Sequence, residues 1–403
     1  MADQSTDLER RWDEHNRQWR DPESVVAWTE AASDADQGLY EHRATAGFWR
    51  VLDQLGITLL VTREYEHLVL ALSVLAGRPR LSYLRLPHPS GLVVDRERSL
   101  VHIACTRNPN QVVTLAPCEG LHERRETHLT RLDGRPLVPV GSRILPGSFY
   151  LHDLALINGE LHANAVGFNA VVLLGDDERA ELVWWPRTME SDGAPRTDRN
   201  YIQLNSIAPG TTLANSYFTA SAERASARRP GHLNFPVDRR GVLFAGDTRE
   251  PVAWGLTRPH SARLHSGEVW IDNSGYGELV VVRGGKVIVA HRLPGWTRGL
   301  CLQGDIAFVG TSRVIPRYQR YAPGLDAASA RCGVHAINIV TGELLGSVYW
   351  PQGNQIFAID WAPVTMMTGL PATVGRAGAR RTRDVFYAFR HPRHTQRMSR
   401  QPG

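Results

Sequence analysis

Apolar and polar positions alternate in short runs along most of the chain, from Ile57 to about residue 360. Apolar runs of roughly five to eight residues, rich in Val, Ile, Leu, Tyr and Trp, are separated by Gly, Pro, Asn and Asp. Long segments with the 3.6-residue period of an amphipathic helix are lacking between these limits. The pattern therefore predicts an all-β domain of many short strands joined by tight turns.

The strand pattern also repeats along the chain. The three clearest copies are HDLALINGELHANAVGFNAVVLL, HSARLHSGEVWIDNSGYGELVVV and TRGLCLQGDIAFVGTSR, which begin at His152, His260 and Thr297. Each has an apolar strand, a glycine seven positions after its first residue, and a second strand. Looser or partial copies begin near Pro89, Gln203 and Gln355. Four-stranded units that recur every 40–60 residues or so are typical of a propeller. We predict a closed β-propeller of six blades, with seven blades as the alternative.

The two ends of the repeat region complement each other. The candidate inner strand at 355–362 has no partner strands downstream, whereas the strands within 57–86 lack an inner partner. Pairing of these two segments would close the ring and remove an exposed sheet edge. We therefore divide the chain into an N-terminal helical or irregular extension (1–56), a propeller (57–362) and an Arg-rich tail (363–403). Within the extension we expect a helix over Ala46–Leu55 that ends at Gly56.

An ordered series of motifs runs from Gly47 to Pro363. They are GFWRVLDQLGITLLVTREYEHLVLAL, RNPNQV, LHDLALINGELHANAVGFNAVV, QLNSIAPG, YFTAS, RPHSARLHSGEVWIDNSGYGEL, LPGWTRGL and FVGTSR. In these motifs the chain resembles a family of uncharacterised bacterial proteins, conserved hypothetical proteins with a propeller-like domain. The resemblance implies the fold and no particular activity. The chain departs from the family at REYEHLVLAL, where members tend to have a Tyr-Gln-x-Gly-Lys-like segment.

Composition and charge narrow the classes of partner. The net charge of +5 comes from the C-terminal 30 residues, where eight arginines face one acid, and the rest of the chain is near −2. A basic end of this kind is most often solvated and mobile. No aromatic and basic stripe marks a nucleic-acid face, and no apolar run reaches membrane-spanning length. We expect neither a specific nucleic-acid partner nor a membrane. The charged N-terminal residues and four cysteines without a CxxC pair favour a cytoplasmic location.

The repeats also predict which side chains meet. The first strands of all blades line the channel and begin at the same face, so polar residues at these positions should gather at one mouth. His152 and His260 hold equivalent positions in two blades and should both point toward the axis. Arg107 and Arg298 fall in the same mouth, where they could hold an anion by paired hydrogen bonds. The candidate substrate-binding residues are Gln203, Asn205, Asn164, Asn273, Trp296 and Gln355.

Two chemistries suit this set. Converging imidazoles with nearby carboxylates can bind a divalent transition metal such as zinc, iron, manganese or copper, and the candidate ligands are His152, His260, Asp153 and Asp272. A bound metal would polarise a carbonyl or lower the pKa of a water to about 7. Without a metal, one histidine would act as general base while Arg107 or Arg298 stabilises an anion. GxSxG, phosphate-loop and HExxH motifs are missing, so we expect no nucleotide cofactor.

Two functions follow from these predictions. The first is an enzyme for a small organic substrate at the channel mouth, of the lactonase or other hydrolase, lyase, isomerase or oxygenase type, with His152 and His260 at its centre. The alternative is a non-catalytic module that binds a peptide or protein partner. Propellers serve both purposes, so the fold alone does not choose between them. A deep polar pocket at the mouth would favour the enzyme, and a flat apolar face would favour the binding module.

Overall fold

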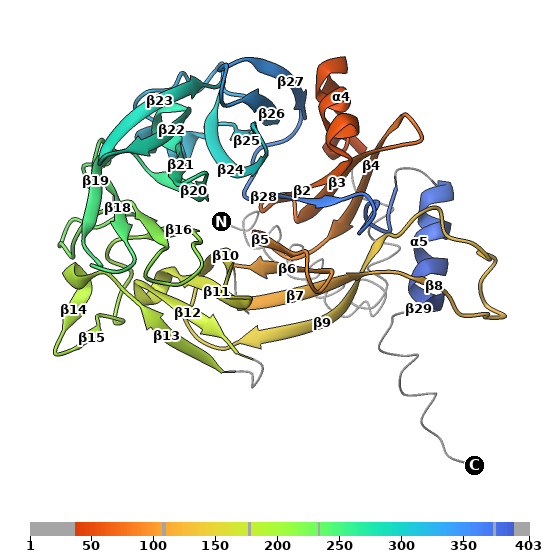
Figure 1. Ribbon diagram of the computed structural model, residues 1–403, viewed down its shortest axis with the longest axis horizontal. Coiled ribbons are helices and arrows are strands. Elements are labelled where there is room, and N and C mark those ends of the chain that lie inside the picture. Colours follow the sequence, from red (N-terminus) through yellow and green to blue (C-terminus); the bar gives the residue numbers. More distant parts are fainter. Residues whose placement is uncertain (1–36, 107–109, 176–178, 233, 374–375, 391–403) are drawn as a thin grey trace, which may run out of the picture.

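The structure, a computed structural model, describes residues 37–390 except 107–109, 176–178, 233 and 374–375. Within these residues, five four-stranded sheets and one five-stranded sheet, all antiparallel, surround one channel as the blades of a propeller (Figure 1). The six-bladed all-β propeller predicted from the repeats is confirmed, and the seven-bladed alternative is wrong.

Each blade runs from an inner strand beside the channel to an outer strand at the rim. Blade 1 comprises β28 (Ile359–Pro363), β2 (Ile57–Arg63), β3 (Leu68–Leu75) and β4 (Arg78–Arg85). Blade 2 comprises β5 (Pro89–Asp95), β6 (Leu100–Cys105), β7 (Asn110–Pro117) and β9 (Leu137–Leu145). Blade 3 comprises β10 (Leu151–Ile157), β11 (Glu160–Ala165), β12 (Ala170–Leu174) and β13 (Ala180–Trp184). Blade 4 comprises β16 (Leu204–Ala208), β17 (Tyr217–Ala220), β18 (Gly241–Ala245) and β19 (Pro251–Leu256). Blade 5 comprises β20 (Pro259–His265), β21 (Glu268–Asn273), β22 (Glu278–Arg283) and β23 (Lys286–Arg292). Blade 6 comprises β24 (Trp296–Gln303), β25 (Ile306–Ser312), β26 (Gly333–Asn338) and β27 (Leu344–Tyr349), and β1 (Arg43–Ala44) pairs with its outer edge.

Blade 1 joins distant parts of the chain. Its inner strand β28 pairs antiparallel with β2, so that Ile57 lies opposite Pro363 and Val61 opposite Ile359. In Figure 1 the blue β28 lies beside the orange-red strands β2, β3 and β4. The strand begins at Ile359, four residues later than Gln355, where we expected it. This pairing covers the inner edge of blade 1, so the ring has no open edge there.

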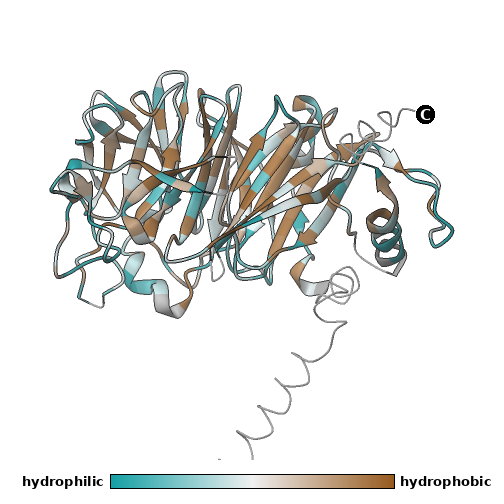
Figure 2. Cartoon of the chain, turned by 90° about the horizontal axis from the view of Figure 1, so that it is seen from below, coloured by the Kyte–Doolittle hydropathy of each residue, from teal (hydrophilic) through white to brown (hydrophobic). Residues whose placement is uncertain are grey.

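The hydrophobic core is organised as layers between neighbouring blades. Leu59 and Val61 share one apolar cluster with Phe308 of blade 6, whereas Leu60 shares another with Ile103 of blade 2. Equivalent clusters lie between blades 2 and 3, 3 and 4, 4 and 5, and 5 and 6. Both faces of a blade are therefore buried, which explains the nearly continuous apolar runs of the sequence. Figure 2 shows hydrophobic residues along the strands and hydrophilic ones toward the loops.

The predicted N-terminal helix packs against the outside of the ring. Helix α4 spans Ala46–Leu55, and Gly56 ends it with a left-handed backbone (φ 60°). Its residues Phe48 and Leu52 are fully buried in the cluster that joins blades 6 and 1. The Phe48 ring lies edge-on to that of Phe308, with centroids 6.4 Å apart.

The segment after the propeller differs from the solvated tail that we expected. Residues Arg376–Ala388 form helix α5, followed by β29 (Phe389–Arg390), which pairs with β8 (Gly120–Leu121). Val385 is buried in a cluster with Cys118 and Val138, beside blade 2. The apolar residues between the arginines thus give this segment a packing face. No helix in the described part of the chain combines the length and apolar character needed to cross a membrane.

Short 3₁₀ helices occupy several connections. η2 (Val166–Phe168) and η4 (Ser274–Tyr276) follow the second strands of blades 3 and 5, so the repeat extends into the turns. η5 (Pro316–Tyr321) lies in a long connection between β25 and β26. The remaining short elements are η1 (Gln37–Leu39), η3 (Arg187–Met189) and the hairpin of β14 (Glu190–Ser191) and β15 (Ala194–Pro195).

Candidate functional site

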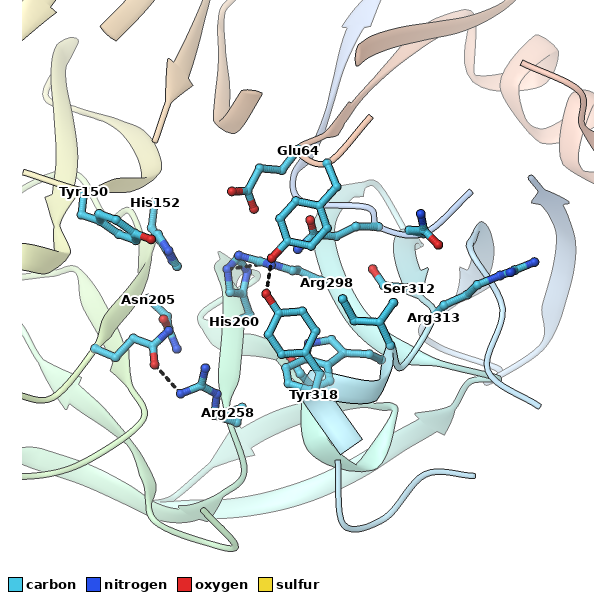
Figure 3. A pocket seen from close by; sticks show the side chains of 17 residues that line it. Glu64, Tyr150, His152, Asn205, Arg258, His260, Arg298, Ser312, Arg313 and Tyr318 are labelled. Atoms are coloured by element: carbon cyan, nitrogen blue, oxygen red, sulfur yellow. Dashed lines mark hydrogen bonds between the residues drawn. The ribbon is translucent and has the colours of Figure 1, made fainter. Parts of the chain in front are cut away.

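A cavity of about 140 Å³ opens at the channel mouth where the inner strands begin. We call this end the upper mouth and its pocket the upper cavity (Figure 3). Most of the lining side chains are polar, and they come from every blade except blade 2. The lining includes seven residues singled out from the sequence: His152, His260, Arg298, Gln203, Asn205, Trp296 and Gln355.

Four neighbouring blades each contribute two side chains to the lining, spaced two residues apart at the start of the inner strand. A spacing of two places both side chains on one face of a strand. The pairs from blades 3 to 6 are Tyr150 and His152, Gln203 and Asn205, Arg258 and His260, and Trp296 and Arg298.

The backbone at these strand starts is unusual. Tyr150, Gln203 and Arg258 have left-handed conformations, with φ of 56°, 49° and 54°. Each is followed within a few residues by a break in the regular strand register. A left-handed residue other than glycine costs roughly 1–3 kcal/mol, and such strain and such bulges are typical of functional sites. Here they aim the paired side chains at the channel axis.

His152 and His260 both line the cavity, with ring centroids 5.9 Å apart and ring planes tilted by 46°. The buried ring of Phe357 packs nearly perpendicular to both, at 5.3 Å and 5.2 Å. The guanidinium of Arg298 lies over the same ring, with its Cζ 3.5 Å from the centroid. One aromatic side chain thus fixes the positions of both imidazoles and a cation.

Hydrogen bonds fix the protonation of His260. Arg298 Nε donates to His260 Nε2 over 3.1 Å, and because arginine can only donate, this imidazole nitrogen carries a lone pair. The proton of His260 is therefore on Nδ1, which donates to Ser261 Oγ at 2.8 Å. Burial, followed by the charge of Arg298, holds the pKa of His260 well below its ordinary range. His260 is consequently a neutral acceptor that orients Arg298.

A buried carboxyl group lies behind this pair. Asp272 faces His260 across the β20–β21 ladder and is fully buried. Burial raises the pKa of Asp272 well above its ordinary range, although the Ser261 hydroxyl and the charge of Arg263 act in the opposite direction. Burial thus favours the neutral form of the Asp272 carboxyl group beneath the cavity.

The upper cavity carries excess positive charge. Neither Arg258 nor Arg298 forms an ion pair with a carboxylate in the described part of the chain. Burial lowers the pKa of both guanidinium groups, that of Arg258 to about 10. Arg313 adds a third cation at the rim, and Glu64 is the one carboxylate among the lining residues.

The other predicted site residues lie elsewhere. Asp153 points away from the cavity and is bound by Arg263 at 2.9 Å. Asn273 is held inside blade 5, where its Nδ2 donates to Glu278 and its Oδ1 accepts from the Thr257 amide. Asn164 is fully buried outside the lining, and Arg107 lies outside the described residues.

The donors around the upper cavity do not fit the metal centre that the histidines suggested. Among the residues that the structure describes, no three or more His, Cys, Asp or Glu side chains come together as a metal site. The His260 lone pair accepts from Arg298, and Asp153 is bound to Arg263. A divalent cation would also lie beside Arg258 and Arg298, which would repel it.

Several lining residues were missed from the sequence. Tyr150 and Arg258 lie two positions before His152 and His260, so a step of one strand period upstream would have found them. Glu64 and Tyr65 follow β2, and extending the turn alignment to blade 1 would have included them. Tyr318 belongs to η5, which has no counterpart in the other copies, so the repeats carry no signal for it.

The fold and this site define a six-bladed β-propeller with a polar, positively charged cavity at one mouth. The chain belongs to the family described as "Domain of unknown function (DUF4915)", whose model matches residues 46–370. This membership confirms the resemblance to an uncharacterised family that the motifs indicated. No curated protein sequence matches the chain.

Solved structures of several propellers are similar to this chain. A chain of the nidogen/laminin complex is 10% identical with a TM-score of 0.50, covering 76% of this chain and 98% of that one. A gluconolactonase from Xanthomonas campestris is 13% identical with a TM-score of 0.46, covering 74% and 86%. A putative gluconolactonase is 17% identical with a TM-score of 0.43, covering 73% and 88%. At such identities the likeness concerns the fold alone.

Proposed function

We propose that the chain is an enzyme that acts on a small organic substrate in the upper cavity by acid–base chemistry without a metal. The observation that carries this proposal is the arrangement of His152, His260 and Arg298 around one cavity. His152 is the general base. Arg298, held by His260 and Phe357, directs its terminal nitrogens toward negative charge on the substrate.

Two reactions fit these roles. His152 takes a proton either from a carbon beside a carbonyl group or from a water that attacks a carbonyl carbon. In both cases an electron pair moves onto the carbonyl oxygen, and Arg298 stabilises the resulting anion. The first route leads to isomerase or lyase reactions, and the second to hydrolysis, including that of lactones. We do not extend the proposal to an oxygenase, because the donors around the cavity do not fit a metal.

The shape of the mouth supports an enzyme over a module for a peptide or protein partner. The mouth is a recessed cavity with paired polar side chains from four blades, whereas a protein partner needs a broad contact surface of about 800 Å². The left-handed residues at the strand starts support the same choice, since they hold the cavity side chains in place at a cost in stability.

Activity profiling of the full-length chain tests the proposal. The purified protein is incubated with a small-molecule extract, and consumed and formed species are followed by mass spectrometry. We expect conversion by the wild type and by the exposed-site control His232→Gln, and a loss of about 100-fold or more in His152→Gln and Arg298→Gln. Unchanged conversion by His152→Gln, or no conversion by the wild type, would overturn the proposal. Loss of activity with a chelator and recovery with zinc would overturn its metal-free part.

A further inference from the structure

We propose that the ligand of the upper cavity is a small hydroxylated organic anion. Its carboxylate or phosphate group binds between Arg258 and Arg298, and a hydroxyl group of the ligand donates to the side-chain oxygen of Asn205 or of Gln355. This inference deepens the proposed function, since it takes the same cavity as the substrate site and names the class of substrate.

The first argument is the uncompensated charge. Two other arginines inside the propeller have carboxylate partners, in the pairs Arg63–Glu66 and Arg263–Asp153, each at 2.9 Å. Arg258 and Arg298 form no such ion pair within the described residues although both are partly buried, and the charge of Glu64 in the lining is the largest influence that acts on the pKa of Arg298 in the opposite direction to burial. Cations buried without a counterion destabilise a protein, so a bound anion would supply the negative charge that the chain itself does not place beside these arginines.

The second argument is the geometry of the donors. Arg298 uses Nε for His260, and its two terminal nitrogens make no hydrogen bond within the described residues. Arg258 donates to Gln203 through one terminal nitrogen and lies over the Tyr321 ring, with Cζ 4.6 Å from the centroid. Both guanidinium groups therefore lie on aromatic rings and keep N–H groups that make no hydrogen bond within the described residues. Such N–H groups suit the paired oxygens of a carboxylate or phosphate.

The third argument concerns two amide oxygens. Asn205 Nδ2 donates to the Pro259 carbonyl at 2.9 Å and to Ser221 at 3.0 Å, which fixes the orientation of the amide. Its Oδ1 makes no hydrogen bond within the described part of the chain, and the same holds for Gln355 Oε1. These side chains are only 3% and 5% exposed. Amide oxygens can only accept, so the matching ligand group is a donor such as a hydroxyl.

The volume of the cavity limits the size of the ligand. A space of about 140 Å³ resembles the engineered cavity of roughly 150 Å³ that holds a benzene molecule. The enclosed part of the ligand therefore has about six to ten non-hydrogen atoms. Hydroxy acids of about four carbons and phosphorylated polyols of about three carbons fit this limit, whereas nucleotides do not.

Binding measurements test the inference without requiring turnover. Isothermal titration would compare malate, succinate, glycerol 2-phosphate and the neutral malamide. We expect malate to bind more tightly than succinate, which lacks the hydroxyl group, and malamide to bind at least about tenfold more weakly than malate. A response to malate alone assigns a carboxylate site, and a response to glycerol 2-phosphate alone assigns a phosphate site.

The variants give the decisive comparison. Arg258→Gln and Arg298→Gln should each weaken binding of the anion about tenfold or more, whereas Arg78→Gln, an equal charge change on the exposed rim of blade 1, should not. Arg298→Lys should retain part of the affinity, and thermal melting of each free variant checks that it folds. Equal binding of malate and malamide, unchanged affinity in both glutamine variants, or no binding by any anion would overturn the inference. Anion binding without His152-dependent conversion would leave the inference standing and overturn only the proposed function.

Discussion

The two ends of the channel are built from the same inner strands, yet their arginine side chains differ in whether a carboxylate pairs with them. At the upper mouth, Arg258 and Arg298 lie beside neutral His260 without a carboxylate partner. At the lower mouth, where the inner strands end, a cavity of about 280 Å³ is bordered by Arg263 and Arg96. There Arg263 pairs with Asp153 at 2.9 Å, and Arg96 pairs with Asp360 at 2.8 Å.

The contrast appears even within one strand. His260 and Arg263 are three residues apart on β20, one at each end of the channel. Burial by itself would lower the pKa of Arg263, but the charge and hydrogen bonds of Asp153 raise it above its ordinary value. For Arg298, burial prevails and the pKa is lowered. At the lower mouth the arginines are paired with carboxylates of the chain, whereas at the upper mouth, under our proposal, an anionic ligand is their partner.

The largest effect is expected from a substitution that breaks the Arg263–Asp153 ion pair at the lower mouth. Asp153→Ala would leave Arg263 buried without its partner, and removing one member of such a pair costs about 3–5 kcal/mol. Denaturant unfolding should show this loss in the free energy of unfolding. Arg298→Gln at the upper mouth should cost less, about 1–3 kcal/mol, because the partner left behind is the neutral acceptor His260 and not a charge. Equal losses in the two variants would show that the two mouths do not differ in this way.

A second prediction concerns pH. The pKa of His260 is far below 6.5 in the folded protein and ordinary in the unfolded chain, so the unfolded chain binds the extra proton as pH falls below about 6.5. Stability is therefore lost on acidification, by up to about 1.4 kcal/mol per pH unit from this group. His260→Gln should flatten the unfolding free energy between about pH 6 and 5, while the exposed-site control His232→Gln should not. An unchanged slope would contradict the neutral state of His260.

The smallest effect is expected at the rim of the upper mouth. The hydroxyl groups of Tyr65 and Tyr318 contact each other, linking the turn after β2 to η5. Tyr318→Phe removes one of these hydroxyls and should change the free energy of unfolding by about 1 kcal/mol or less. Titration of malate should show a change in affinity of only a few-fold. A loss as large as that in Arg298→Gln would move the binding group from the arginines to this contact.

The repeats carried the prediction of the fold furthest. Gly159 and Gly267 occupy the same place in two copies, which fixed the inner strands of blades 3 and 5 and predicted that His152 and His260 would meet. What the repeats lack are contacts that cross blades. Asp153 follows His152 and so points to the opposite side of its strand, where Arg263, 110 residues away, binds it. A pattern read along one strand has no information on that partner.

Segments outside the repeats were the least predictable. The arginine-rich sequence after residue 373 predicted solvated chain because its charge dominates the composition. The packing of α5 depends on Val385, whose partners Cys118 and Val138 are more than 240 residues upstream. The lining residue Tyr318 likewise comes from an insertion whose place in space is set by the blade that carries it.

The shared sheet of β28 and β2 has a consequence for biosynthesis. A ribosome that adds about 5–20 residues per second needs roughly 15–60 s to reach Pro363 after finishing Ile57. Throughout that interval β2 presents an unpaired apolar edge on the nascent polypeptide. Messages truncated before codon 359 would therefore yield products that depend on chaperones, however complete their middle blades are.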